Sequence, residues 1–170
     1  SGGTDKSLTI TNSSATSPAA IWIGSTGAGT SGNTIKNSII NTGSNTATSY
    51  GIAISNATTI GNAGADNDNV TIQNNTITQC YYGVFASGTT ATSAGGLDNL
   101  SINNNIIGPA SAGATSIGLV GVRIDGAVNP AVTLNTIQNV NGVAASSGGI
   151  ITTSAVAGGT ISQNIIQNFS

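Results

Sequence analysis

The chain has very few ionisable side chains. Of its 170 residues, 5% are charged, and glutamate and histidine are absent altogether. Three cations and a net charge of −2 argue against nucleic acid as a partner, because such binding depends on neutralising phosphates. The same shortage argues against an anionic membrane surface. No apolar run approaches the roughly 18 residues needed to cross a bilayer, so we expect no membrane insertion.

Sulfur is equally scarce, with one cysteine and no methionine. We expect Cys80 to be a small buried apolar side chain rather than a reactive thiol. In place of charge and sulfur, the sequence contains Asn, Ser, Thr and Gly dispersed among Ile, Val and Ala. This composition is typical of turns and stacked strands rather than of helices.

One motif recurs along the whole chain. Each copy starts with an apolar residue, continues through a polar corner, and has a second apolar residue five positions later. The spacings between successive copies are 25, 37, 30, 30 and 29 residues, and the copies begin at Ile10, Ile35, Ile72, Ile102, Val132 and Ile161. A repeat of this period predicts a solenoid, in which one position per coil forms a column along the molecule.

A second motif, Gly–apolar–x–apolar or a close variant of it, follows each corner. It occupies residues 20–23, 51–54, 83–86, 121–124 and 149–152. Such alternation indicates a short strand with its apolar side chains inward. Inserts of different lengths precede it and are expected to project from one side. We therefore predict an all-β fold, a right-handed parallel β-helix of five to six coils, open at both ends, with residues 1–170 as one segment of a longer chain.

The polar corners predict two columns of asparagine. Coils lie about 4.8 Å apart, so identical amides can bond along the stack. Side chains on a strand alternate between inward and outward. Counted from the inward apolar residue that starts each motif, the residue two positions later also points inward, and the residue after that forms a second column beside it. We expect the inward column to hold Asn12, Asn37, Asn74 and Asn104, and the next to hold Asn75, Asn105, Asn135 and Asn164. We interpret both as structural ladders.

Two of the repeats resemble those of a known family. Residues 70–77 (VTIQNNTI) and 100–107 (LSINNNII), each followed by a Gly-led strand, are similar to repeats of right-handed parallel β-helix proteins of the pectate-lyase-like kind. The resemblance covers essentially the whole chain and implies that fold. The charge-poor, Ser/Thr/Asn/Gly-rich style also resembles large exported bacterial surface proteins, such as type IX secretion cargo. That similarity implies an extracellular, cell-surface location.

Enzymes of the resembled family cleave polyuronates with clustered Asp, an Arg or Lys base and often Ca²⁺, so the charged residues need attention. Arg123 and Asp125 lie two apart on a strand and point to the same outward face. We interpret them as an exposed ion pair, and a lyase or hydrolase site is the alternative. Asp66 and Asp68 resemble the start of a calcium loop, but the full loop pattern is missing, so we interpret them as part of a solvated turn and keep a calcium site as the alternative. We expect no other cofactor.

The outward column of the Gly-led strands contains aromatic side chains. It reads Trp22, Ala53, Phe85, Arg123 and Ile151. Exposed aromatic residues in one column are unusual, so they either form a strip that binds sugars or a protein, or lie beneath inserts or an adjoining domain. Tyr50 and Tyr82 precede the glycine in neighbouring coils and are expected to stack on one another.

These features predict a non-catalytic, stalk- or adhesin-like module. Its binding candidates are Trp22, Phe85, Arg123 and Asp125. Its expected partners are flanking domains of the same chain or further copies stacked end to end, with glycan as a possible ligand. An ice-binding solenoid is a further alternative, because one outward column reads Thr9, Thr34, Thr71, Ser101, Ala131 and Thr160. The column two residues further on lacks this uniformity.

Overall fold

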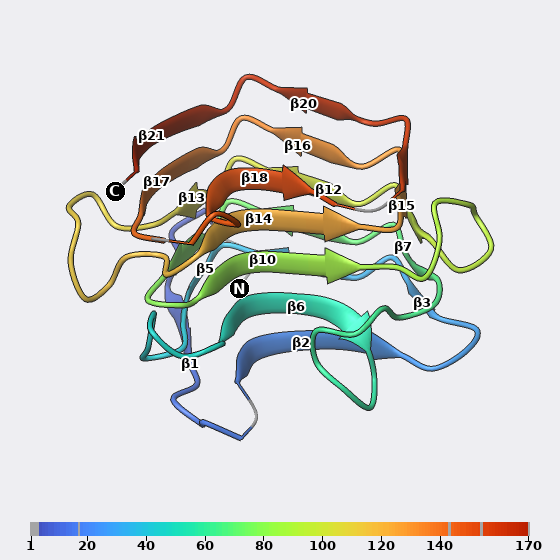
Figure 1. Cartoon of the computed structure of the whole chain (residues 1–170), viewed down its shortest axis with the longest axis horizontal. Coiled ribbons are helices and arrows are strands. Elements are labelled where there is room, and N and C mark those ends of the chain that lie inside the picture. Colours follow the sequence, from blue (N-terminus) through green and yellow to red (C-terminus); the bar gives the residue numbers. More distant parts are fainter. Residues whose placement is uncertain (1–3, 17, 143, 154, 170) are drawn as a thin grey trace.

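The computed structural model describes residues 4–16, 18–142, 144–153 and 155–169. These residues wind into a parallel β-solenoid of about five turns (Figure 1). They contain strands and no helix, and accordingly no helix long and apolar enough to cross a membrane. The all-β fold class predicted from the sequence is confirmed.

Each turn contains four strands in a fixed order. The first is a long strand: β2 (Ala19–Ser25), β6 (Tyr50–Asn56), β10 (Tyr82–Ser87), β14 (Val120–Asp125) and β18 (Gly148–Thr152). A two-residue strand follows: β3 (Thr30–Ser31), β7 (Asn67–Asp68), β11 (Leu97–Asp98), β15 (Ala127–Val128) and β19 (Val156–Ala157).

The remaining two strands of each turn flank the polar corner. Before the corner lie β4 (Thr34–Lys36), β8 (Thr71–Gln73), β12 (Ser101–Asn103), β16 (Ala131–Thr133) and β20 (Thr160–Ser162). After it lie β5 (Ser38–Asn41), β9 (Thr76–Thr78), β13 (Ile106–Ile107), β17 (Thr136–Val140) and β21 (Ile165–Phe169). One strand, β1 (Leu8–Thr11), precedes the first turn and pairs with β5.

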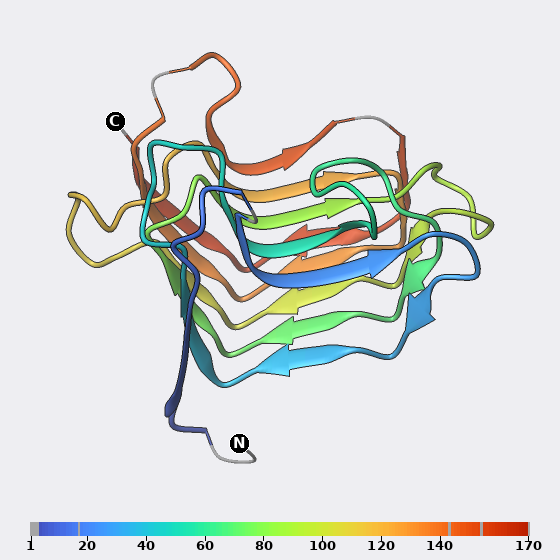
Figure 2. The ribbon, with the colours of Figure 1, turned by 90° about the horizontal axis from the view of Figure 1, so that it is seen from below.

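The solenoid is right-handed. In Figure 1 the long strands lie in front and run to the right, whereas β12, β16 and β20 lie behind and run to the left, as the chain climbs from blue to red. Figure 2, from below, shows the same two sheets on opposite sides of the coil. The strand pairing is parallel throughout, for example between β6 and β10. This hand agrees with the preference for right-handed crossovers.

The interior consists of stacked apolar columns. One column contains Ile35, Ile72, Ile102, Val132 and Ile161 in register. A second contains Ile40, Ile77, Ile107, Ile137 and Ile166. In the central turns these side chains are fully buried, and burial of each isoleucine contributes roughly 1.5 to 3 kcal/mol. Cys80 also lies in this core, as predicted, and burial raises the pKa of its thiol to about 12.

The first of the six predicted repeat copies is wrong. Ile10 on β1 pairs in register with Ile40, so it belongs to the second apolar column rather than the first. Asn12 therefore lies after a fourth strand and not at a corner, and its side-chain amide donates to the carbonyl of Ala19 at 2.6 Å. The described chain begins halfway round a coil, and the spacing of apolar residues alone does not distinguish the two columns.

The predicted inward asparagine column is only partly present. Asn37 is buried and accepts from the side-chain amide of Asn74 at 2.8 Å, whereas Asn104 is exposed. All three residues are left-handed, with φ values of 57°, 52° and 53°. A left-handed residue interrupts the strand alternation, so the residue after it turns inward. Asparagine suits this position because it tolerates left-handed backbone. The inward column is therefore the second one: Asn75, Asn105, Asn135 and, in the last turn, Asn164.

This column is a continuous hydrogen-bonded ladder, as predicted for its members. The side-chain amide of Asn105 donates to Oδ1 of Asn135 at 2.9 Å and to the carbonyl of Ile72 at 2.9 Å. Its own Oδ1 accepts from the side chain of Asn75 at 3.1 Å and from the backbone N–H of Asn75 at 2.9 Å. Every polar atom of this buried amide therefore has a partner.

In four of the five long strands, β6, β10, β14 and β18, a glycine near the start of the strand is required by close packing, whereas β2 has Ala20 at this position. A Cβ on Gly121 would lie 2.5 Å from Cγ2 of Ile137 and 2.6 Å from the carbonyl oxygen of Gly149. Gly83 meets the same obstacles one turn earlier, at Ile107 and Gly121. The glycine column therefore lets the long strand lie against the second apolar column.

Both ends of the solenoid are open within the described residues, as predicted. Leu8 is 48% exposed at the first end, and β21 is exposed along its length at the other. The apolar side chains uncovered on the last turn are Ile161, Ile165, Ile166 and Phe169. The outer edges of β20 and β21 pair with no other described strand. The equivalents of Ile161, Ile166 and Phe169 one turn earlier are buried, whereas Ile165 is in register with Thr136 and the exposed Ile106 on the outer face.

Candidate functional site

The outer face of the long-strand sheet carries the predicted column of varied side chains. Trp22, Ala53, Phe85, Arg123 and Ile151 lie in register on adjacent strands. Their surroundings differ, however. Trp22 is 39% exposed, whereas Phe85 is 4% exposed. The expected exposed strip is therefore open at Trp22 and closed at Phe85.

Phe85 is covered by the protein itself. It forms a small apolar cluster outside the solenoid interior, with Tyr50, Ala53 and Ala19, and Ile60 and Tyr82 pack against this group. We call these six residues the outer cluster. The rings of Tyr50 and Tyr82 stack as predicted, with centroids 5.2 Å apart and planes at 8°, and Phe85 meets both edge-on. The insert after β6, which contains Ile60, provides the cover.

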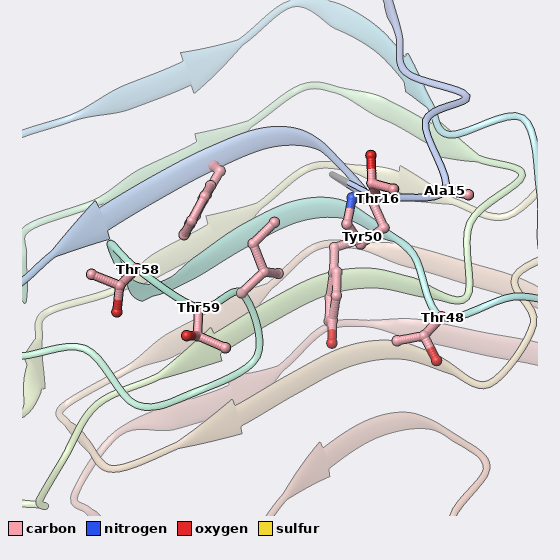
Figure 3. Close-up of a pocket in the computed structure, with 9 residues that line it drawn as sticks. Ala15, Thr16, Thr48, Tyr50, Thr58 and Thr59 are labelled. Atoms are coloured by element: carbon pink, nitrogen blue, oxygen red, sulfur yellow. The ribbon is translucent and has the colours of Figure 1, made fainter.

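A pocket of about 540 Å³ opens beside the outer cluster, which is a volume typical of small-ligand sites. Figure 3 shows Tyr50 standing between Thr48 on one side and Thr58 and Thr59 on the other. We call it the Trp22 pocket, and its described lining consists of Ala15, Thr16, Pro18, Trp22, Thr48, Tyr50, Thr58, Thr59 and Ile60. The described lining combines two aromatic rings with four threonine hydroxyls and contains no charged side chain.

Local hydrogen bonds fix the walls of the Trp22 pocket. The indole N–H of Trp22 donates to the hydroxyl of Ser55 on β6 at 2.9 Å, which orients the ring. The insert begins with a turn in which Oδ1 of Asn56 accepts from the backbone N–H of Thr58 at 2.8 Å and from its hydroxyl at 2.6 Å. The pocket is therefore built on a rigid sheet and an internally bonded turn.

Tyr50 keeps its proton at physiological pH. Burial raises the pKa of its hydroxyl, the neighbouring Tyr82 raises it further, and Arg123 acts in the opposite direction. A neutral hydroxyl both donates and accepts hydrogen bonds. The pocket thus presents neutral polar groups beside aromatic surface, which suits recognition of an uncharged polar ligand.

Arg123 and Asp125 lie further along the same sheet and do not line the Trp22 pocket. The guanidinium Nε of Arg123 is 3.0 Å from a carboxylate oxygen of Asp125, and Cζ of Arg123 lies 5.5 Å from the ring centroid of Phe85. The hydroxyl of Thr153 donates to the other carboxylate oxygen of Asp125. Both carboxylate oxygens of Asp125 therefore have hydrogen-bond partners. The bond from Thr153 joins β14 to the next turn of the solenoid.

Asp66 and Asp68 also have internal partners. The carboxylate of Asp66 accepts from the backbone N–H of Gly95, and that of Asp68 accepts from the backbone N–H of Asp98 at 2.9 Å. Among the residues that the structure describes, no group of three or more His, Cys, Asp or Glu side chains is placed to hold a metal ion. The observed bonds join two neighbouring turns of the solenoid.

A second hollow lies among the inserts before the long strands. We call it the Tyr81 groove; it measures about 280 Å³ and is lined by Asn45, Thr46, Tyr81, Gly118, Leu119, Asn141 and Ala144. The inserts that form it were predicted to share one side, whereas the groove itself and the role of Tyr81 were missed. The adjacent tyrosines 81 and 82 were the available signal, because Tyr81 is an aromatic residue at the end of an insert, directly before β10.

The column considered for ice binding is only partly as expected. Thr34, Thr71, Ser101, Ala131 and Thr160 lie in register on the strands before the corners. Thr9 lies opposite Ile39 on a different sheet, so it does not belong to this face. The parallel column holds Lys36, Gln73, Asn103, Thr133 and Ser162, and its side chains differ in size and charge.

Comparison of the chain with protein-family profiles, with curated proteins and with solved structures gives no match. The parallel β-solenoid is therefore established by the structure itself. Any functional conclusion must come from the chemistry of the surface.

Proposed function

We propose that the chain is a non-catalytic β-helix module that binds a neutral glycan in the Trp22 pocket. The half-exposed ring of Trp22 beside an uncharged, hydroxyl-lined hollow is the observation that carries the proposal. Aromatic rings pack against the apolar face of a sugar, and the threonine and Tyr50 hydroxyls can bond to its hydroxyl groups. Phe85 contributes by supporting Tyr50 from beneath.

The scaffold supports a role in display. Five stacked turns with a saturated amide ladder form a stiff rod, and the pocket lies on its flank. We propose that the chain is a stalk- or adhesin-like segment of an exported bacterial cell-surface protein, related to the pectate-lyase-like β-helices and to type IX secretion cargo. Its repeats and its charge-poor composition support this assignment.

Calorimetric titration with a panel of neutral oligosaccharides and polyuronates tests the glycan proposal. We expect binding of a neutral oligosaccharide and a loss of about tenfold in affinity, equivalent to about 1.4 kcal/mol, for Trp22→Ala. Leu134→Ala is the matched control, because Leu134 is an exposed apolar side chain at a corner remote from the pocket. Equal affinity of the Trp22→Ala variant and the unaltered chain would refute the proposal.

The same panel tests the competing functions. Turnover of a polyuronate that is abolished by Arg123→Ala would replace the binding module with a lyase or hydrolase. Thermal hysteresis that is lost on Thr71→Tyr would favour an ice-binding face instead. We expect neither, since Asp125 is engaged by Arg123 and Thr153, and the threonine column is interrupted at Ala131.

We propose in addition that the last turn packs against a further β-coil, from the same polypeptide or from a second copy. Ile165, Ile166 and Phe169 are exposed there beside an unpaired strand edge, and such edges readily pair. Sedimentation velocity over a range of concentrations should show self-association that Ile165→Lys reduces. A monomer at all concentrations would exclude the second copy as the partner.

A further inference from the structure

We infer that the ligand is an extended oligosaccharide that occupies the Trp22 pocket and the Tyr81 groove together. This inference rests on the proposed glycan binding and adds the length and direction of the ligand. It arises from a feature that joins the two hollows, namely a continuous run of tyrosine rings.

The run begins in one hollow and ends in the other. Tyr50 lines the Trp22 pocket, and Tyr81 lines the groove. Tyr82 lies between them, with its ring centroid 5.2 Å from that of Tyr50 and 5.4 Å from that of Tyr81. Tyr81 and Tyr82 are both half-buried, so part of each ring faces solvent. The two hollows are thus joined by a run of contacting rings, in which Tyr50 is 7% exposed and Tyr82 and Tyr81 are half-buried.

The Tyr81 groove has the same chemical character as the Trp22 pocket. Its lining offers a ring and Leu119 together with the amide of Asn45 and the hydroxyl of Thr46, and none of the described lining residues is charged. A single neutral polymer therefore suits both hollows. A ligand with carboxylate or sulfate groups would find no counter-charge in either lining.

The groove is formed by the fold and not by loosely placed loops. A Cβ on Gly118 would lie 1.8 Å from the carbonyl oxygen of Asn45 and 2.8 Å from the ring of Tyr81, so glycine allows two inserts to close around that ring. The backbone of Tyr81 is held on both sides. Its N–H donates to the hydroxyl of Ser49 at 3.0 Å, and its carbonyl accepts from the N–H of Leu119 at 2.9 Å.

The position of the hollows along the rod gives the direction of the ligand. The Trp22 pocket is built from the first two turns, whereas the groove draws on the inserts before β6, β14 and β18. The two linings extend from the first turn to the fifth, and turns are spaced about 4.8 Å apart, so a ligand that fills both spans roughly 19 Å along the solenoid axis. A chain of several sugar units has that reach and a monosaccharide does not.

Calorimetric titration with a size series of neutral cello- and xylo-oligosaccharides, from disaccharide to hexasaccharide, tests the inference on the full chain. We expect affinity to rise with length. Trp22→Ala should weaken binding of every member, whereas Tyr81→Ala should weaken only the longer members, by about tenfold, and leave the disaccharide unchanged. Asn45→Ala, which removes only a side-chain amide from the groove, should weaken the longer members in the same way.

The outcomes separate this inference from the proposed function. If Tyr81→Ala and Asn45→Ala bind every length like the unaltered chain while Trp22→Ala does not, the extended ligand is refuted and the Trp22 pocket stands. If no oligosaccharide of either series binds, glycan recognition fails together with the inference. Thermal unfolding of each variant checks its fold, and Asn45→Ala decides the question if Tyr81→Ala does not fold.

Discussion

The asparagine corner and the outer face of the long-strand sheet are both columns of one residue per turn, but they are built differently. At the corner, Asn75, Asn105 and Asn135 repeat the same side chain and satisfy one another. On the outer face, successive turns present Trp22, Ala53 and Phe85, which cannot repeat one interaction. In this molecule the uniform column holds the fold, whereas the varied column is open to solvent at Trp22 and buried at Ala53 and Phe85.

The largest expected effect is at Phe85, where the outer face itself becomes structural. Phe85→Ala should lower the free energy of unfolding by about 3 to 5 kcal/mol, because the ring is buried and supports both Tyr50 and Tyr82. Urea unfolding followed by circular dichroism measures this change. A loss below about 1 kcal/mol would show that the outer cluster contributes little to stability, and it would contradict a structural role for Phe85.

The ladder should come next. Asn105→Ala removes bonds to Asn75, Asn135 and Ile72 in a buried site, and we expect a loss of roughly 3 kcal/mol. The neighbouring Asn104 is exposed and left-handed, so Asn104→Gly should be close to neutral in the same urea experiment. Equal losses for the two variants would mean that the corner depends on its backbone geometry and not on the ladder.

The glycine column offers a sharper test of uniform packing. Gly121→Ala introduces a Cβ within 2.5 Å of Ile137, and overpacking of this kind costs about 1 to 3 kcal/mol. Gly113→Ala is the matched control, because no atom lies within 4 Å of its Cβ position. Calorimetric melting of both variants should show a lowered transition temperature for the first alone.

Cys80 gives the core a smaller, pH-dependent effect. In the folded protein the thiol has a pKa of about 12, which is above the value of 9.0 for an exposed thiol. The contribution of the buried thiol to the free energy of unfolding is therefore fully present below pH 9 and is lost as pH rises towards 12. At pH 10 the loss is about 1.4 kcal/mol. Urea unfolding at pH 8 and pH 10, compared with Cys80→Ala, isolates the thiol from the tyrosines. An identical pH dependence in the variant would contradict the buried thiol.

The solenoid itself could be predicted from the sequence because its inner columns repeat. The Gly-led strands and the stacking of Tyr50 on Tyr82 followed from spacing alone. The inward direction of Asn75 did not, since the left-handed conformation of Asn74 reverses the alternation and leaves no mark in the order of polar residues. The half-coil offset of Ile10 was missed for a related reason: both apolar columns use isoleucine.

The candidate site was less predictable than the fold. Trp22 was singled out because aromatic side chains in an outward column are unusual. The pocket beside it could not be foreseen, because its walls come from inserts whose paths depend on tertiary packing, such as Ile60 on Phe85. The groove at Tyr81 likewise depends on the closure of two inserts at Gly118.

The most direct test of the account uses the single tryptophan of the chain as its own reporter. Trp22 is 39% exposed, so a neutral oligosaccharide that packs on its ring should shift its fluorescence emission to shorter wavelength and protect it from acrylamide quenching. We expect both changes to saturate at the affinity measured by calorimetry. Saturating calorimetric binding with unchanged emission and quenching would place the ligand elsewhere and contradict the Trp22 pocket as the binding site.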